Sequence, residues 1–221
     1  LVARVMINRI WQRVFGHGLV RTPEDFGLQG QQPTHPDLLD WLAVEMHDGG
    51  WNLKAMVRAM VLSRTFRQSS AWRTDIDDPE NRLLARSLSY RLDAEVLRDS
   101  ILVAAGQLDP EMGGLTIRKL QQYDLNYSFE TSRRSVYVPA FRKSMLDLFE
   151  VFDIANPNLV VGHRNTSTLP TQALYLMNSP WVIEQSRAAA KRLMATSGSS
   201  GRDQAEMLEL VYRRTLGRQP T

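Results

Sequence analysis

The stretch Val2-Ala3-Arg4-Val5-Met6-Ile7-Asn8-Arg9-Ile10-Trp11-Gln12-Arg13-Val14-Phe15 decides the fold class of this chain. Its apolar residues recur every three or four positions, a spacing that predicts one broad apolar stripe along an α-helix. They are Val2, Met6, Ile7, Ile10, Trp11 and Val14. Gly16 and Gly18 follow, and we expect them to end the helix because glycine adopts the left-handed cap conformation at no steric cost.

Similar periodicity and capping signals predict further helices along the chain. We expect them after Thr34-His35-Pro36-Asp37, over 53–65, from Asp78, over 92–105, over 143–152, from Leu169, from Pro180 and over 203–216. One run, Ser135-Val136-Tyr137-Val138, has the composition of a β-strand. The predicted fold class is therefore mainly α: an orthogonal helical bundle with long irregular loops and at most a small β element.

The helical segments predict a single helical domain over 1–221, which we expect to be cut from a longer protein at both ends. Periodicity fails over about 107–134, which we interpret as an irregular insertion, and the Ser/Gly-rich stretch at about 197–202 predicts a flexible linker. The apolar faces of 139–193 look too small to stand alone. We expect this block to pack onto the first helices, up to about Ser70.

The composition is that of an ordinary globular protein and argues against several other classes of protein. The chain has 221 residues, of which 43% are hydrophobic and 23% charged, as in ordinary globular proteins. Its net charge is only +3 and no long run of like charge occurs, so we do not expect a nucleic-acid partner. The absence of cysteine excludes disulfides and thiolate metal sites within the segment. No apolar run reaches the roughly 20 residues that span a bilayer.

Two polar segments are candidate sites. The first places a cation, an imidazole and hydroxyls just before a helix start, where free backbone N–H groups favour an anion. It consists of His163, Arg164, Asn165, Thr168 and Gln172. In an alternative interpretation, Thr168 caps the helix and Arg164 pairs with a carboxylate from another loop.

The second and weaker candidate set brings a histidine close to carboxylates, which suits acid–base chemistry or a metal. Its members are Asp25, His35, Asp37 and Arg142. A histidine at a helix start is also an ordinary hydrogen-bonded turn residue. None of the histidines is paired with another at helical metal-site spacing, so we predict no metal.

Several sequence motifs resemble those of the domain of unknown function 1553, a planctomycete-rich bacterial family. They include Asn8-Arg9-Ile10-Trp11, Pro33-Thr34-His35-Pro36, Arg91-Leu92-Asp93-Ala94-Glu95 and Pro170-Thr171-Gln172-Ala173-Leu174. The blocks occur in order over nearly the whole chain. No catalytic residues are known to us in this family, so the resemblance assigns none here.

The resemblance implies a place in a large exported protein, beside a cytochrome-c-like domain, in the periplasm or at the cell surface. No Cys-x-x-Cys-His occurs, so we expect no cofactor in this segment and haem only in a neighbouring domain. We expect a binding or scaffold module whose partners are other domains of the polypeptide or a cell-surface polymer. The alternative is an enzyme domain acting on an extracellular substrate such as a polysaccharide, with His35, His163 and Arg164 in a shared pocket.

Overall fold

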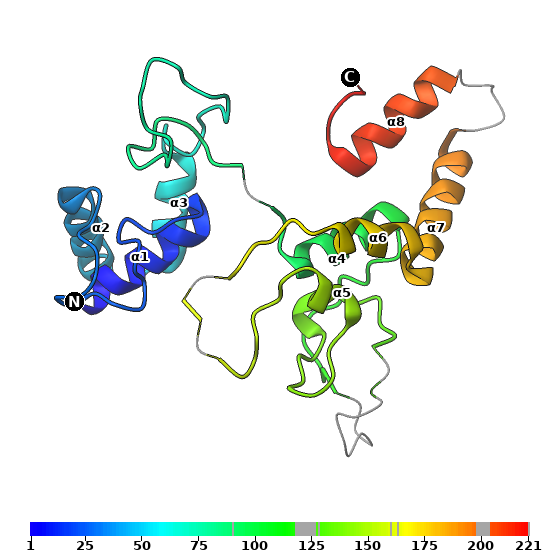
Figure 1. Ribbon diagram of the computed structural model, residues 1–221, viewed down its shortest axis with the longest axis horizontal. Helices are drawn as coiled ribbons and strands as arrows, with labels where there is room; N and C mark the ends of the chain where they lie inside the picture. The colour runs from blue at the N-terminus through cyan, green and yellow to red at the C-terminus, as the bar shows by residue number, and fades with distance from the viewer. Residues whose placement is uncertain are drawn as a thin grey trace. The chain divides into compact units, whose positions relative to one another are not determined.

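A computed structural model of the chain describes residues 1–89, 91–117, 127, 129–159, 161–162, 164–197 and 204–220. The described part is mainly helical, as predicted. It divides into two compact units, Leu1–Arg91 and Leu92–Thr221, each with a hydrophobic cluster of its own. The single domain over 1–221 stays a prediction. Figure 1 shows the helices of both units.

The first unit contains α1 (Val2–Phe15), α2 (Pro36–Asp48) and α3 (Leu53–Leu62), and α1 packs against both of the others. The apolar stripe predicted for residues 2–15 supplies the centre of its core. The buried residues are Ile7, Trp11, Leu19, Val20, Leu39, Leu42, Met46, Met56 and Met60. Asn52 caps the start of α3, because its side chain accepts a 3.1 Å hydrogen bond from the Ala55 N–H.

A buried amide fastens the loop that follows α1. Asn8 is 0% exposed; its Nδ2 donates to the Val20 carbonyl at 3.0 Å and its Oδ1 accepts the Val20 N–H at 2.8 Å. Gly18 lies so close that a Cβ there would be 2.5 Å from the Val20 carbonyl oxygen. Both polar groups of the Val20 backbone are therefore satisfied inside the core, as burial requires.

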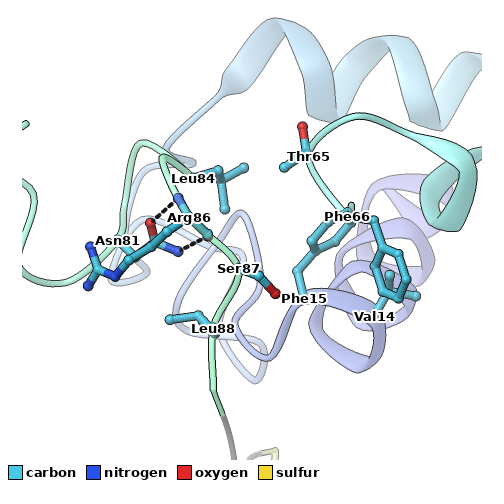
Figure 2. A pocket seen from close by; sticks show the side chains of 9 residues that line it. All are labelled: Val14, Phe15, Thr65, Phe66, Asn81, Leu84, Arg86, Ser87 and Leu88. Carbon is cyan, nitrogen blue, oxygen red and sulfur yellow. Dashed lines mark hydrogen bonds between the residues drawn. The ribbon is translucent and has the colours of Figure 1, made fainter. Parts of the chain in front are cut away.

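The prediction of a helix starting at Asp78 is wrong, because this segment forms turns. The Asp78 carboxylate accepts the backbone N–H groups of Arg82 and Leu83, at 2.7 and 2.6 Å. Asn81 and Leu84 have φ of 52° and 57°, which a right-handed helix does not allow. The Asn81 side chain bonds both the N–H and the carbonyl of Arg86, so side chains take the place of helical backbone bonds (Figure 2).

The second unit is organised around α4 (Ala94–Ala105). Its other elements are η1 (Ser135–Tyr137), α5 (Asp147–Val151), α6 (Pro170–Asn178), α7 (Pro180–Ser197) and α8 (Gln204–Leu216). Helix α4 contacts η1, α5, α7 and α8, and Figure 1 shows it beside α5 and α7. The core residues are Ala94, Val138, Leu148, Phe149 and Phe152. Gly106 ends α4 in the left-handed conformation.

Two expectations for this unit are corrected. The run 135–138 is a 3-10 turn and not a strand, because the Asp99 carboxylate takes the Ser135 N–H that a ladder would need. The helix expected over 143–152 shortens to the five residues of α5. In the described part of 107–134 the one β feature is an isolated bridge between Asp109 and Arg133, and no helix occurs.

The block 139–193 does not depend on the first helices for a core. Its helices α5 and α7 pack against α4, and Phe149 and Phe152 are buried in the same cluster as Ala94. Helix α4 therefore supplies the apolar surface that this block was expected to lack. The predicted linker at about 197–202 lies almost wholly outside the described residues. None of the described helices has the length and apolarity needed to cross a bilayer.

Candidate functional site

The strongest predicted site residue, Arg164, forms an ion pair. Its guanidinium donates to both carboxylate oxygens of Glu95, at 2.7 and 2.8 Å, and Asp93 lies 3.7 Å away. The hydrogen bonds from Arg164 to Glu95 raise the pKa of Arg164, burial opposes that rise, and the charges of Glu95 and Asp93 add to it. As in the alternative interpretation, Arg164 pairs with a carboxylate, but Glu95 lies in the first turn of α4 and not in a loop, and the N-cap residue of α6 is Leu169 and not Thr168. His163 lies outside the described residues.

The other members of that segment serve the loop itself. Gln172 is 2% exposed; its carboxamide oxygen accepts the Leu169 N–H and its NH₂ group donates to the Val151 carbonyl. The Asp153 carboxylate accepts the N–H and the hydroxyl of Ser167, both at 2.7 Å. These bonds join the loop after α5 to the start of α6. Asn165 and Thr168 are exposed.

The members of the weaker candidate set belong to different units: Asp25, His35 and Asp37 to the first and Arg142 to the second. Asp25 accepts the Gly27 N–H at 2.8 Å, and His35 Nδ1 lies 3.0 Å from the Thr34 hydroxyl. Asp37 is exposed in the first turn of α2, and Arg142 is exposed in the second unit. Asp25 and His35 thus have local turn contacts, as the ordinary interpretation of such residues predicts.

A site that sequence reasoning missed surrounds Arg98 of α4. Arg98 is 2% exposed, although arginine is almost never fully buried without partners. Its Nη1 donates to the Arg133 carbonyl at 2.9 Å and to the Ser135 hydroxyl at 3.3 Å, and its Nη2 donates to the Thr131 carbonyl. The available signal was its position on the same helical face as Ala94, Leu102 and Ala105. A charged residue within the buried face of a helix indicates that partners elsewhere in the fold compensate its burial.

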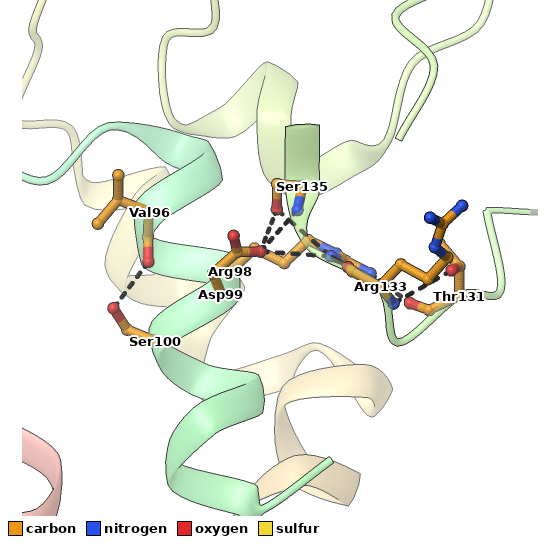
Figure 3. A network of polar contacts seen from close by, with 7 residues as sticks. All are labelled: Val96, Arg98, Asp99, Ser100, Thr131, Arg133 and Ser135. Carbon is orange, nitrogen blue, oxygen red and sulfur yellow. Dashed lines mark hydrogen bonds and ion pairs between the residues drawn. The ribbon is translucent and has the colours of Figure 1, made fainter. Parts of the chain in front are cut away.

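Asp99, the next residue, holds Ser135, one of the hydrogen-bond partners of Arg98. Its Oδ1 accepts the Ser135 N–H at 2.8 Å and the Ser135 hydroxyl at 2.6 Å, and lies 3.7 Å from Arg98 Nη1 (Figure 3). Burial lowers the pKa of Arg98 and the Asp99 charge partly offsets that effect. A guanidinium stays charged at any physiological pH. The result is a fixed, buried cation whose nearest carboxylate is already bonded to another residue.

Arg98 lines a cavity of about 420 Å³, which we call the Arg98 cavity. Its walls combine charged, hydroxyl-bearing, aromatic and aliphatic side chains from α4, α5, α6, α7 and the segment before η1. The lining residues are Arg98, Phe129, Glu130, Thr131, Leu146, Asp147, Leu148, Tyr175, Ser179, Pro180 and Trp181. Apolar walls with a few converging polar groups are typical of ligand sites, and the volume falls in their range.

Two other cavities in the described part of the chain lack the combination of buried charge and aromatic side chains found in the Arg98 cavity. In the first unit a cavity of about 80 Å³ lies between Phe15, Phe66 and Leu84, with Asn81 and Arg86 bonded to each other at its wall (Figure 2). A more open groove of about 490 Å³ lies between Gly106 and the α7 residues Arg187, Lys191 and Arg192. Among the described residues, no group of three or more histidine, aspartate or glutamate side chains is placed to hold a metal ion.

Fold and cavity together define a mainly helical protein with a mixed polar and aromatic pocket beside a buried arginine. The family model described as "Protein of unknown function (DUF1553)" matches residues 1–221, so the chain belongs to this family. No curated protein and no solved structure matches the chain.

Proposed function

We propose that the chain is a non-catalytic binding module of a larger exported polypeptide, and that it holds its ligand in the Arg98 cavity. One observation carries the proposal: a buried guanidinium, fixed by protein carbonyls and a hydroxyl, lines a cavity of ligand size. The guanidinium has more N–H groups than these three bonds use. A donor that is already held in place loses little conformational freedom when a ligand binds.

The shape of the site supports binding in a second way. Tyr175 packs edge-on against buried Phe152, with ring centroids 6.4 Å apart, and Leu148 in the cavity wall is 1% exposed. The wall therefore belongs to the core of the second unit. Close-packed cores do not deform easily, so this part of the cavity wall is preformed.

The family suggests the setting. Similarity to a family whose members lie in exported proteins beside a cytochrome-c-like domain supports an extracytoplasmic location, in the periplasm or at the cell surface. Because the chain has no cysteine, thioether-linked haem would belong to a neighbouring domain. The proposed partners are those neighbouring domains and a cell-surface polymer.

A second candidate function, an enzyme acting on an extracellular polysaccharide, is favoured by one observation. Glu130 and Asp147 line the same cavity, and a pair of carboxylates is what glycoside hydrolysis commonly uses. Of the residues first considered for this role, Arg164 pairs with Glu95 and His35 Nδ1 lies near the Thr34 hydroxyl, while His163 lies outside the described residues.

A thermal-shift screen of the full polypeptide tests the proposal, with soluble glycans, short peptides, small carboxylates and metal ions as ligands. A ligand that binds the folded state raises Tm by mass action. We expect at least one class of compound to raise Tm, and a Trp181→Ala variant to lose that response. Mass spectra of the incubated ligands should show no product, since turnover would favour the enzyme. A blank screen would contradict a ligand site and favour a scaffold that contacts only other domains.

A further inference from the structure

We infer that the ligand of the Arg98 cavity is a neutral, hydroxyl-rich saccharide unit, such as one or two rings of a larger polymer. The inference rests on the proposed binding function and adds the class of ligand. It is drawn from three properties of the cavity wall: its aromatic rings, its mixture of donors and acceptors, and its charge.

Three aromatic side chains reach the cavity from separate parts of the second unit. Phe129 comes from the segment before η1, Tyr175 from α6 and Trp181 from the first turn of α7. An aromatic face carries partial negative charge. The C–H face of a sugar ring is apolar and weakly positive, so it packs well against such a face. A purely hydrophobic ligand would also pack against the aromatic rings, but it would leave the polar groups of the cavity wall without hydrogen-bond partners.

The polar wall offers both donors and acceptors. Arg98 is donor only, the carboxylates of Glu130 and Asp147 are acceptors only, and the hydroxyl of Ser179 is both. A sugar hydroxyl donates and accepts in the same way as serine. A ligand with several adjacent hydroxyls can therefore satisfy both kinds of group, which a simple anion or cation cannot.

Charge separates a neutral sugar from an acidic one. The lining contains one cation, Arg98, and two carboxylates, Glu130 and Asp147. Arg98 is buried while both carboxylates are exposed. A bound anion would share the cavity with those carboxylates, and like charges in a binding site are unfavourable. The cavity should therefore prefer neutral glycans to uronates or sulfated glycans.

The size of the cavity agrees with a short stretch of saccharide. A volume of about 420 Å³ lies toward the lower end of the range for small-molecule sites, roughly 300–1,000 Å³. That space accommodates one or two sugar rings and not a long chain. A polymer would bind with its remaining units outside the cavity.

The test is a glycan array of neutral and acidic oligosaccharides probed with the full polypeptide, followed by calorimetric titration of the strongest hits. We expect neutral glycans to bind, and acidic glycans of the same linkage to bind at least about fivefold more weakly. Trp181→Phe and Asp147→Asn should each weaken binding about tenfold, as expected for a smaller stacking face without the indole N–H or for a lost charged hydrogen bond. Trp72→Phe is the matched control, because Trp72 is 61% exposed in the first unit, and should change nothing.

The outcomes separate this inference from the binding function itself. Stronger binding of the acidic glycans would overturn the inference but leave the site in place. The same holds if peptides or carboxylates, and no glycans, bind in a manner that depends on Trp181. Glycan binding that survives both cavity substitutions unchanged would place the ligand elsewhere and contradict the Arg98 cavity as the site.

Discussion

The guanidinium of Arg164 and the carboxylate of Glu95 form two parallel hydrogen bonds of 2.7 and 2.8 Å across 69 positions of sequence. They tie the loop before α6 to the first turn of α4, and their side chains are 27% and 26% exposed. A fork-to-fork pair of this kind is stronger than a single charged contact, although partial exposure to water weakens it. The sequence alone suggested that Arg164 binds an anion from solution, whereas in the structure the carboxylate of Glu95 occupies that role.

Breaking the Arg164–Glu95 pair should lower the free energy of unfolding by about 1–2 kcal/mol. Lysine cannot form two parallel bonds, so Arg164→Lys should cost nearly as much as Glu95→Gln. A double-mutant cycle in urea should give a coupling energy of about 1 kcal/mol. Arg213→Lys serves as control, since Arg213 pairs with Glu209 on the surface of α8 with 59% exposure. A coupling energy near zero would show that the Arg164–Glu95 pair does not contribute to the free energy of unfolding.

Asn8→Ala should destabilise the first unit by about 2–4 kcal/mol, because it leaves the buried N–H and carbonyl of Val20 without partners. Asn8→Asp should also be costly, since a carboxylate cannot donate to the Val20 carbonyl at 3.0 Å. Chemical denaturation followed by circular dichroism measures both. Arg9→Ala, at the exposed neighbouring position, should cost under about 0.5 kcal/mol. Equal losses at positions 8 and 9 would contradict the role given to Asn8.

Gly106→Ala should cost more than Gly50→Ala. Both glycines have positive φ, 72° and 67°, so each substitution should cost about 1 kcal/mol in backbone strain. At Gly106 the new Cβ would also lie 2.9 Å from Cδ of Arg192, whereas nothing lies within 4 Å at Gly50. Arg192 would have to move and lose its 3.0 Å bond to the Val103 carbonyl, which adds about 1 kcal/mol. Identical melting temperatures for the two variants would count against this close contact.

Acid should weaken the turn built around Asp78. Burial disfavours the Asp78 carboxylate, but hydrogen bonds from the Leu83 and Arg82 N–H groups and the charges of Arg86 and Arg21 lower its pKa overall. A carboxyl group with a lower pKa when folded stabilises the protein above its unfolded pKa of about 3.9. That stabilisation is lost as the pH falls through the folded value.

Melting temperatures between pH 2 and 7 should therefore separate wild type from Asp78→Asn above about pH 4 and converge below it. Asp77→Asn, at an exposed neighbouring position, should follow the wild-type curve. A constant difference between wild type and Asp78→Asn at every pH would show that the ionised carboxylate is not the stabilising form.

The helices were predictable where an apolar stripe ends at a glycine, as over 2–15. The helix expected at Asp78 shows the limit of such signals. Asp-Pro-Glu is a common helix start, but here the Asp78 carboxylate folds onto Arg82 and Leu83 and closes a turn. Local sequence cannot distinguish the two, because the choice depends on later residues, Asn81 and Leu84, adopting positive φ.

The site was harder to predict than the fold. Arg164 stood out, but its partner lies 69 positions away, and no local pattern reports such a pairing. Arg98 was passed over because its partners are carbonyls of Thr131 and Arg133, in a segment without periodicity. Any residue supplies a carbonyl, so the sequence of that segment carries no sign of the contact. Only the fold brings the buried cation, Trp181 and Asp147 to one cavity.

One measurement tests the central claim most directly: ¹⁹F NMR of the polypeptide labelled with 5-fluorotryptophan and titrated with the strongest oligosaccharide from the array. This chain contains five tryptophans, and Trp181 is the one that lines the Arg98 cavity. Assigned by a Trp181→Phe variant, its resonance should shift with saturation while those of Trp11, Trp41, Trp51 and Trp72 stay in place. Saturable binding that leaves the Trp181 resonance unmoved would contradict the account.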